Sequence, residues 1–486
     1  MSRKPTARLL FLLPFALYGC EVGPDYVRPT ASVPTAYKEN QGWTPASPQQ
    51  VAGWENWWAI YDDPMLDALE KQVDISNQNL KAAEAAYRAA HAQVAIDRAS
   101  ILPTISADAS VRTSGGGAGS AAAITPADGT GGGTSVRTGG GTRTVYQASL
   151  DGTWDIDLWG RIRRTVEGSA ASAQASAADI AAARLSAQSE LAVDYFQLRA
   201  ADAQAQLLTT SISDFETALQ IARNRYQAGI TTETDIFAAQ TQIDNAQPQL
   251  VGVQLTRARM EHAIATLTGM PASAFSVDRA PIATTVPVVP ADVPSTLLER
   301  RPDIAASEYA VAAANAQIGV AISAFFPNLT LSGSYGFAST SLGSLFTAPN
   351  SVWSFGPALA ETLFDGGARV AQTQQARARY DQAVANYRQT VLTAFQQVED
   401  QLAALKVLEQ QAGVDDQTVA DARQSEQLAL NQYRAGTADF TTVITAQTAR
   451  VNAENAALDV LNQRLAASAN FVMALGGGWD RSRSPQ

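Results

Sequence analysis

The feature that most constrains this sequence is an internal duplication. The segment RYQAGI at 225–230 returns as QYRAGT at 432–437, an offset of 207 residues. Upstream, Pro103 matches Pro327 at an offset of 224, and a Gly-rich insert around 114–142 accounts for the difference. Aligned Tyr, Gly and Pro residues carry more weight than matching alanines, since alanine is abundant in any long helix. The two halves are therefore expected to form the same supersecondary unit.

The chain begins with the pattern of a bacterial lipoprotein signal. Three basic residues within the first eight precede the short apolar run 9–17, and Gly19 and Cys20 follow where a lipobox ends. We expect residues 1–19 to be the signal peptide and Cys20 to carry the lipid. An ordinary signal peptide or membrane anchor with an incidental cysteine is the alternative. The apolar run is shorter than the roughly 20 residues of a membrane-spanning helix.

The remaining chain divides into two repeats and their connectors. Residues 20–64 are interrupted by prolines and predict a lipidated N-terminal segment with a belt region, and residues 271–302 predict a belt linker between the repeats. Repeat 1 is expected over 65–270 and repeat 2 over 303–478, each as a helix, two strands and a long helical hairpin. The last residues, 479–486, are expected to be a tail.

Four segments alternate apolar and polar residues with the period of two that is typical of strands. They lie at about 104–113, 144–158, 328–338 and 351–364. Strands of about ten residues with one apolar and one polar face are what an outer-membrane barrel requires, and a water-soluble sandwich with one wet face is the alternative. Four strands cannot close a barrel. The barrel interpretation therefore needs at least two chains, and three chains would give 12 strands.

The polar face of the second predicted strand is acidic. Asp151, Asp155 and Asp157 share this face, so we expect a negative lumen that prefers cations. The fourth predicted strand is less regular, because Pro357 lacks an N–H donor and Glu361 falls on the apolar parity. This strand is expected to bulge, or to have left the membrane by Glu361.

Two long stretches, 160–228 and 366–435, carry apolar residues at heptad spacing. A continuous helix of this length would span roughly 100 Å. Gly229 and Gly436 end these stretches as left-handed caps do, and another helical segment follows each, which predicts two antiparallel hairpins. Abundant alanine favours a curved wall of adjacent helices. A periplasmic spacer coiled coil is the alternative.

The composition argues against an enzyme. The 35 basic and 46 acidic residues give a net charge of −11, which disfavours nucleic acid as a partner. One Cys and two His leave little for a disulfide framework or for a metal or redox site. No phosphate-binding loop or nucleophile elbow is evident. We therefore predict no catalytic residue, no cofactor and no metal.

Several blocks of the chain resemble one known family. They are Val22–Tyr26, two residues after Cys20, then 297–304 (LLERRPDI), 314–319 (ANAQIG) and 363–367 (LFDGG). In this order and spacing the blocks resemble the outer membrane factor lipoproteins, the TolC-like channels of tripartite efflux systems, in the NodT-type subfamily. The resemblance covers essentially the whole mature chain.

The resemblance implies a homotrimer of mixed α and β structure in the outer membrane. Its 12-stranded barrel would continue into a periplasmic α-helical barrel and conduct substrates passively from an inner-membrane pump and a periplasmic adaptor. Multidrug efflux is the expected role, and metal efflux or type I protein secretion are the alternatives within transport. A periplasmic coiled-coil structural lipoprotein is the alternative outside transport.

The resemblance also implies functional positions at the ends of the hairpins. The turns that would contact the adaptor are Ala228, Gly229, Ile230, Ala435, Gly436 and Thr437. The residues that would hold the periplasmic gate closed are Tyr226, Asp235, Tyr433 and Asp439. Relatives often carry an acidic residue where this chain has Thr445, so one acidic ring of the family is missing here.

Overall fold

The computed structural model describes residues 21–39, 54–115, 142–288, 299–479 and 481. The predicted signal peptide and the lipidation site Cys20 lie outside the described residues, as do most of the Gly-rich insert and part of the predicted linker between the repeats.

The chain divides into two compact units, which are described separately. The strand unit comprises Met1–Val27, His91–Ala171 and Ala312–Asp381. The helix unit comprises Arg28–Ala90, Ser172–Val311 and Gln382–Gln486.

The helices confirm the duplication. The first half contains α3 (Gln78–Ala99), α4 (Arg161–Gln227) and α5 (Glu233–Leu267), and the second contains α7 (Pro302–Ser323), α8 (Ala368–Ala435) and α9 (Phe440–Ala474). Both ends of α5 and α9 are related by the same offset as the two turn motifs, and both ends of α3 and α7 by the same offset as Pro103 and Pro327. With 67 and 68 residues, α4 and α8 are the two long helices that the heptad spacing predicts. None of the helices within the described ranges has the length and apolar character needed to cross a membrane.

Shorter elements accompany this framework. They are η1 (Trp54–Tyr61), α2 (Pro64–Ser76), η2 (Ala272–Ala274), η3 (Leu342–Ser344) and η4 (Ala348–Asn350). The Asp63 carboxylate caps α2 by accepting hydrogen bonds from the N–H groups of Met65 and Leu66, and Pro64 occupies the first turn, where its missing N–H costs nothing.

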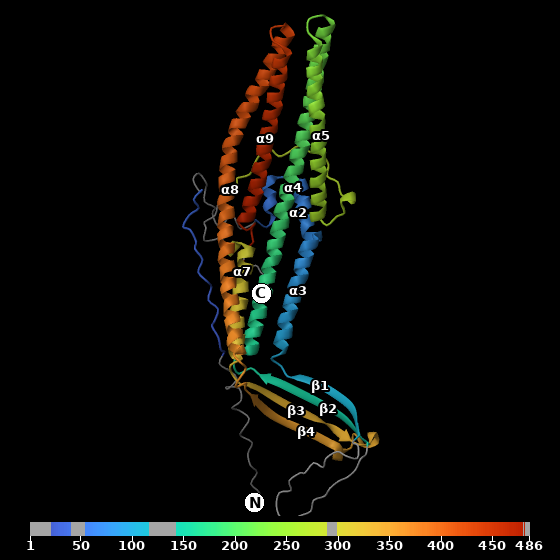
Figure 1. The fold of residues 1–486 in the computed structure, drawn as a ribbon, viewed down its shortest axis with the longest axis vertical. Coiled ribbons are helices and arrows are strands. Elements are labelled where there is room, and N and C mark those ends of the chain that lie inside the picture. The colour runs from blue at the N-terminus through green and yellow to red at the C-terminus, as the bar shows by residue number, and fades with distance from the viewer. Residues whose placement is uncertain (1–20, 40–53, 116–141, 289–298, 480, 482–486) are drawn as a thin grey trace, which may run out of the picture. The chain divides into compact units, whose positions relative to one another are not determined.

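The strand unit contains one antiparallel sheet in the order β1-β2-β3-β4 (Figure 1). Its strands are β1 (Thr104–Gly115), β2 (Thr142–Ile156), β3 (Asn328–Ser339) and β4 (Ser351–Ala360). The prediction of four strands is confirmed. Pro357 pairs with Leu331 in a regular ladder, and β4 ends before Glu361. The fourth strand was expected either to bulge or to have left the membrane by Glu361, and it ends before Glu361 without a bulge.

The strand register gathers the apolar residues on one face of the sheet. Val111 lies opposite Tyr146, Leu150 lies opposite Tyr335, and Tyr335 lies opposite Trp353. The other face is polar, and Asp151 on β2 lies between Ser106 and Ser334. The apolar face is exposed in the single chain, with Trp353 75% exposed. An apolar face without cover needs lipid or a partner protein.

Paired glycines fix equivalent junctions in the two repeats. Gly269 has φ 70° and Gly476 has φ 97°, so both adopt the left-handed conformation that favours glycine. A Cβ on Gly269 would lie 2.4 Å from the carbonyl oxygen of Ser76, and one on Gly476 would lie 2.2 Å from that of Arg300. Because Ser76 and Arg300 are themselves equivalent positions of the two repeats, at the offset that relates Pro103 to Pro327, the same close approach ends each repeat.

Within the helix unit, the hairpins α4–α5 and α8–α9 (Figure 1) share an apolar cluster, while α4 and α8 each begin in the strand unit. Leu219, Ile243, Tyr433 and Phe440 belong to it, so all four helices contribute. Burying such side chains stabilises the packed state by about 1.5–3 kcal/mol each.

The two repeats differ in the chemistry of one buried position. Arg450 occupies the position in the second repeat that the buried Ile243 occupies in the first. Its guanidinium lies 2.9 Å from Asp214, 2.5 Å from Glu426 and 3.0 Å from Glu454. This ionic cluster joins α4, α8 and α9, whereas the equivalent position of the first hairpin is apolar.

Glu70 on α2 is a buried acid. It is 0% exposed, and neither of its carboxyl oxygens has a hydrogen-bond partner among the residues that the structure describes. Burial, together with the nearby Asp74 carboxylate, raises the pKa of Glu70 to about 9. The folded protein therefore keeps this carboxyl protonated at neutral pH, whereas the unfolded chain releases the proton near its ordinary pKa of about 4.5.

We expect Glu70→Gln to flatten the pH dependence of stability. Between about pH 4.5 and 9 the folded state binds the extra proton, so the free energy of unfolding falls as pH rises, by up to about 1.4 kcal/mol per unit. A neutral amide removes this loss. The apparent melting temperature of Glu70→Gln should equal that of the wild type at pH 5 and exceed it at pH 8. Exposed Glu84→Gln is the matched control, and parallel pH profiles for the wild type and Glu70→Gln would contradict the assignment.

Candidate functional site

The turns that end the two long helices have the same geometry. Gly229 (φ 72°) and Gly436 (φ 78°) adopt the left-handed conformation. The N–H of Ile230 donates to the carbonyl of Arg225 at 2.9 Å, and that of Thr437 donates to Gln432 at 2.9 Å. These bonds satisfy the last carbonyls of each helix, and the predicted αL caps are confirmed.

Both turns present their backbone to the surroundings. All six residues of the two predicted contact turns are exposed, namely Ala228, Gly229, Ile230, Ala435, Gly436 and Thr437. A side chain at Gly229 would point into open space, since no atom of the described residues lies within 4 Å of the Cβ position. The turns are accessible to a partner.

A polar cluster next to these turns joins the two repeats. The buried Tyr433 on α8 donates its hydroxyl to the carboxylate of Asp235 on α5 at 3.2 Å, and Thr231 donates to the same carboxylate oxygen. The guanidinium of Arg225 lies 4.5 Å from the centre of the Tyr433 ring and donates to the Tyr433 carbonyl. Phe440 also packs against Tyr433, with the centroids of the two rings 5.1 Å apart. We call Arg225, Thr231, Asp235 and Tyr433 the tip cluster.

Two of the four predicted gate residues belong to the tip cluster. Asp235 and Tyr433 are brought together, whereas Tyr226 is 45% exposed and Asp439 is exposed at the N-cap of α9 without a side-chain capping bond. Sequence reasoning missed Arg225 and Thr231. Arg225 could have been noticed because its equivalent in the second repeat is the uncharged Gln432.

The environment of Tyr433 favours its protonated form. Burial raises the pKa of this tyrosine above its usual value of 10, and the neighbouring Asp235 carboxylate raises it further. The hydroxyl therefore remains a donor throughout the physiological range. Arg225 and Asp235 give the tip cluster one charge of each sign around this neutral donor, which makes its hydrogen bonds charge-assisted.

The predicted acidic face of β2 is partly neutralised by the start of α4. Asp151 accepts a hydrogen bond from Ser149 at 2.8 Å. Asp155 lies 3.4 Å from Arg161, and Asp157 lies 3.3 Å from Arg163. Because β2 ends at Ile156, Asp157 lies beyond the strand that was predicted to contain it. The two arginines reduce the negative field that the sequence pattern alone predicts.

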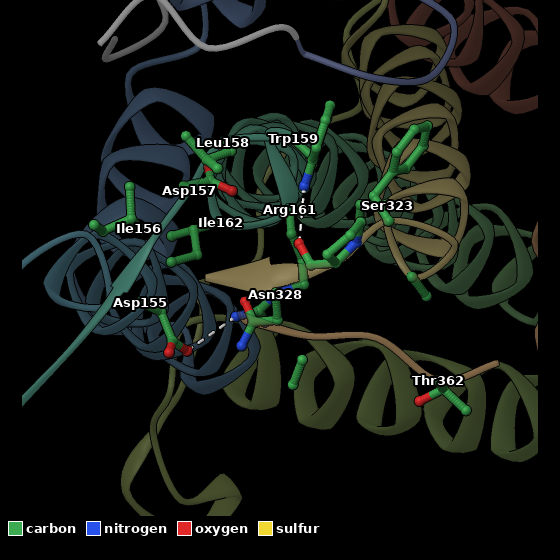
Figure 2. Close-up of a pocket in the computed structure, with 14 residues that line it drawn as sticks. Asp155, Ile156, Asp157, Leu158, Trp159, Arg161, Ile162, Ser323, Asn328 and Thr362 are labelled. Atoms are coloured by element: carbon green, nitrogen blue, oxygen red, sulfur yellow. Dashed lines mark hydrogen bonds and ion pairs between the residues drawn. The ribbon is translucent and has the colours of Figure 1, made fainter. Parts of the chain in front are cut away.

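A small cavity of about 170 Å³ lies where β2 leads into α4 (Figure 2). Asp155, Asp157, Arg161 and Asn328 line it together with the aromatic Trp159. Its carboxylates already have basic or hydroxyl partners, and the part of the chain that the structure describes holds no group of three or more His, Cys, Asp or Glu side chains suited to a metal ion. The cavity therefore gives no indication of a catalytic or metal site.

Comparison with known protein families decides the identity. The family model described as "Outer membrane efflux protein" matches residues 69–270 and 293–477. The chain belongs to this family. Its members are outer-membrane channels of efflux pumps, extend into the periplasm and are not enzymes. The exposed turns and the tip cluster are thus features of an outer membrane efflux protein.

Individual relatives extend over nearly the whole chain. The probable efflux pump outer membrane protein TtgC of Pseudomonas putida is 30% identical over 473 residues, which cover 96% of this chain and 94% of that protein. The cation efflux system protein CusC of Escherichia coli is 27% identical and covers 98% and 100%, respectively. The solved outer-membrane channel OprN superposes with a TM-score of 0.86 at 28% identity, covering 95% of this chain and all of that one.

We expect Asp235→Asn to loosen the tip cluster of this outer membrane efflux protein. The substitution keeps the shape of the side chain but removes the charge that strengthens the bonds from Tyr433 and Thr231, and charge-assisted bonds are roughly twice as strong as neutral ones. Single-channel recordings in planar bilayers should show a higher mean conductance, because the tip opens more often. Asp244→Asn, at an exposed position of the same helix, is the control of equal charge change and should behave as the wild type. Equal effects of the two substitutions, or none from Asp235→Asn, would refute the predicted gating role.

Proposed function

We propose that three copies of this outer-membrane efflux channel protein assemble into one duct with a 12-stranded barrel and a periplasmic tunnel of helices. The open edges of the sheet carry this proposal. β1 and β4 are its terminal strands, and each has a strand partner on one side within the described chain. In a bilayer an unpaired backbone group costs several kcal/mol, so β1 of one copy must pair with β4 of the next.

The exposed apolar face supports the same arrangement. Ile105 on β1 and Trp353 and Phe355 on β4 are at least 70% exposed in the single chain. The strand register places them on the face opposite Asp151. In the closed barrel this face would meet lipid, and the polar face would line the lumen.

The helices also carry apolar stripes without cover. On α5 the exposed apolar residues include Phe237, Val251 and Leu255, and on α8 they include Val407, Val414 and Leu428. Neighbouring members of each set are separated by one helical turn, one heptad or two heptads, and such spacing keeps each set on one side of its helix. We infer that α5 of one copy packs against α8 of the next, which continues the barrel closure along the helices.

We further propose that the chain is a NodT-type lipoprotein attached through Cys20 to the outer membrane. The support lies in the sequence, where the signal pattern precedes the lone cysteine and the VGPDY block follows it. The exposed turns at Gly229 and Gly436 would contact a periplasmic adaptor that delivers substrates from an inner-membrane pump. The tip cluster would hold the resting aperture closed.

Native mass spectrometry of the detergent-solubilised protein tests the assembly. We expect a complex of three chains, each heavier than the chain that begins at Cys20 by the mass of its acyl groups. Cys20→Ser should remove the added mass, while leaving a three-chain complex that conducts ions in bilayers. A lone subunit that shows no conductance would contradict the proposal of a shared barrel.

We propose organic antibiotics and solvents as the cargo. Relatives named for such efflux include the antibiotic efflux pump outer membrane protein ArpC and the toluene efflux pump outer membrane protein TtgC, both of Pseudomonas putida and both 30% identical to this chain. CusC, named for cation efflux, is the second candidate at 27%.

Deletion of this chain in its native host distinguishes the two cargo classes. The inhibitory concentrations of hydrophobic antibiotics and toluene should fall several-fold and return on complementation, whereas those of silver and copper salts should not change. Sensitivity to the metal salts alone would assign the channel to cation efflux instead.

A further inference from the structure

The N-terminal segment that follows Cys20 binds to a buried arginine of the strand unit. The side chain of Arg164 on α4 is 4% exposed. It lies 3.2 Å from the Glu21 carboxylate and 2.8 Å from that of Asp25, and it donates to the carbonyl of Val22 at 3.4 Å. Within the described chain its other carboxylate partner is Glu167, one turn along the same helix at 2.8 Å. Most of the groups that compensate this buried charge therefore come from the N-terminal segment.

Glycines permit the N-terminal segment to lie close to α7 and to the start of α4. A Cβ on Gly23 (φ 104°) would lie 2.5 Å from the Cα of Gly319 on α7. A Cβ on Gly160 would lie 2.7 Å from the Cγ of Glu21. A Cβ on Gly319 would lie 2.9 Å from the Cγ of Arg164. Any larger residue at these positions would force the segment and the helices apart.

Two further bonds hold the backbone of the segment. The N–H of Val22 donates to the carbonyl of Trp159 at 3.1 Å, and the side-chain amide of Asn315 donates to the carbonyl of Pro24 at 2.8 Å. With Arg164 these contacts fix both ends of Val22–Asp25. The VGPDY block and the ANAQIG block, which the sequence analysis linked only by resemblance, therefore meet in space.

The segment binds beside an aromatic pair that is typical of a membrane interface. The rings of Trp159 and Phe326 stack with centroids 4.7 Å apart, and the indole of Trp159 donates to the carbonyl of Pro327 at 2.9 Å. Trp159 follows the end of β2 along the chain, and Phe326 precedes the start of β3. Tryptophan and other aromatic residues concentrate at the headgroup level of a bilayer.

We propose that Arg164, Gly160, Asn315 and Gly319 form a docking groove for the mature N-terminus. The groove fixes Glu21–Asp25 beside the Trp159–Phe326 pair, so acyl chains on the residue that precedes Glu21 would enter the bilayer close to one defined point of the barrel wall, as a fixed anchor rather than a free tether. The placement of the lipid rests on the proposed modification of Cys20, whereas the docking itself does not.

Limited proteolysis of the protein in liposomes tests the docking. Arg164→Met removes the charge that the segment compensates, and Gly23→Ala blocks the close approach without altering Arg164. We expect either substitution to increase non-specific cleavage within residues 21–39, read by mass spectrometry, by about tenfold or more, because cleavage reports the population of the undocked segment.

Matched controls separate docking from general damage. Arg163→Met changes the neighbouring arginine, which pairs with Asp157, and Gly367→Ala changes a glycine of similar φ (91°) with open space around it. Both should retain wild-type protection. If Arg164→Met fails to fold, as judged by loss of the channel in bilayers, Gly23→Ala decides alone. Wild-type protection in Gly23→Ala, or equal cleavage in the variants and their controls, overturns the groove.

Labelling with radioactive palmitate distinguishes failure of the lipid proposal from failure of the groove. We expect wild type, Arg164→Met and Gly23→Ala to incorporate the label and Cys20→Ser to lack it but keep its protection from cleavage. Absence of label in the wild type would overturn the anchor placement while leaving the docking supported. Loss of protection in Cys20→Ser would show that the lipid, rather than the groove, holds the segment, and would overturn the docking.

Discussion

The need to satisfy backbone hydrogen bonds at the edges of a four-stranded sheet governs this protein. β1 and β4 leave one edge each for a partner, and the sheet exposes an apolar face that water does not favour. In lipid both problems have one solution, which is closure with further copies of the same sheet. The proposed oligomer is therefore an answer to the number of strands per chain, and the apolar stripes on α5 and α8 would extend the same closure to the helices.

The duplication gives each chain two copies of the same helical hairpin. Residues that differ between the two copies are candidates for functional positions. The caps at Gly229 and Gly436 have the same hydrogen bonds. The repeats differ where Arg225 replaces an uncharged equivalent and binds Tyr433 of the other repeat. They differ again where Arg450 forms a buried ionic cluster in place of Ile243. Breaking a buried ion pair by removing one partner leaves an unpaired charge, so loss of a single member of such a cluster is costly.

The N-terminal segment is held in place by contacts with the strand unit. A buried guanidinium is stable only when hydrogen-bonded anions surround it, and α4 supplies just one of the three carboxylates around Arg164. The short block after Cys20 supplies the other two of these described carboxylates, in addition to its place behind the predicted signal peptide.

The sequence alone determined the architecture, because strand alternation, heptad spacing and terminal glycines are local properties. They were sufficient for four strands, two long helices, the αL caps and the repeat offsets. The order and spacing of the blocks were sufficient for the family. The predicted ends of single strands were less accurate. The second strand was expected to reach residue 158, but β2 ends at Ile156 and does not include Asp157.

Only the tertiary structure decided which side chains meet across the repeats. Asp235 and Tyr433 are 198 residues apart, and Arg164 and Asp25 are 139 apart. No local pattern encodes such pairs, because the distance between them depends on how helices pack. For the same reason the sequence did not reveal that Arg161 and Arg163 pair with Asp155 and Asp157. It also did not reveal that, of the four predicted gate residues, Tyr226 and Asp439 lie outside the tip cluster. Periodicity predicts which face a residue occupies, whereas packing decides what lies opposite it.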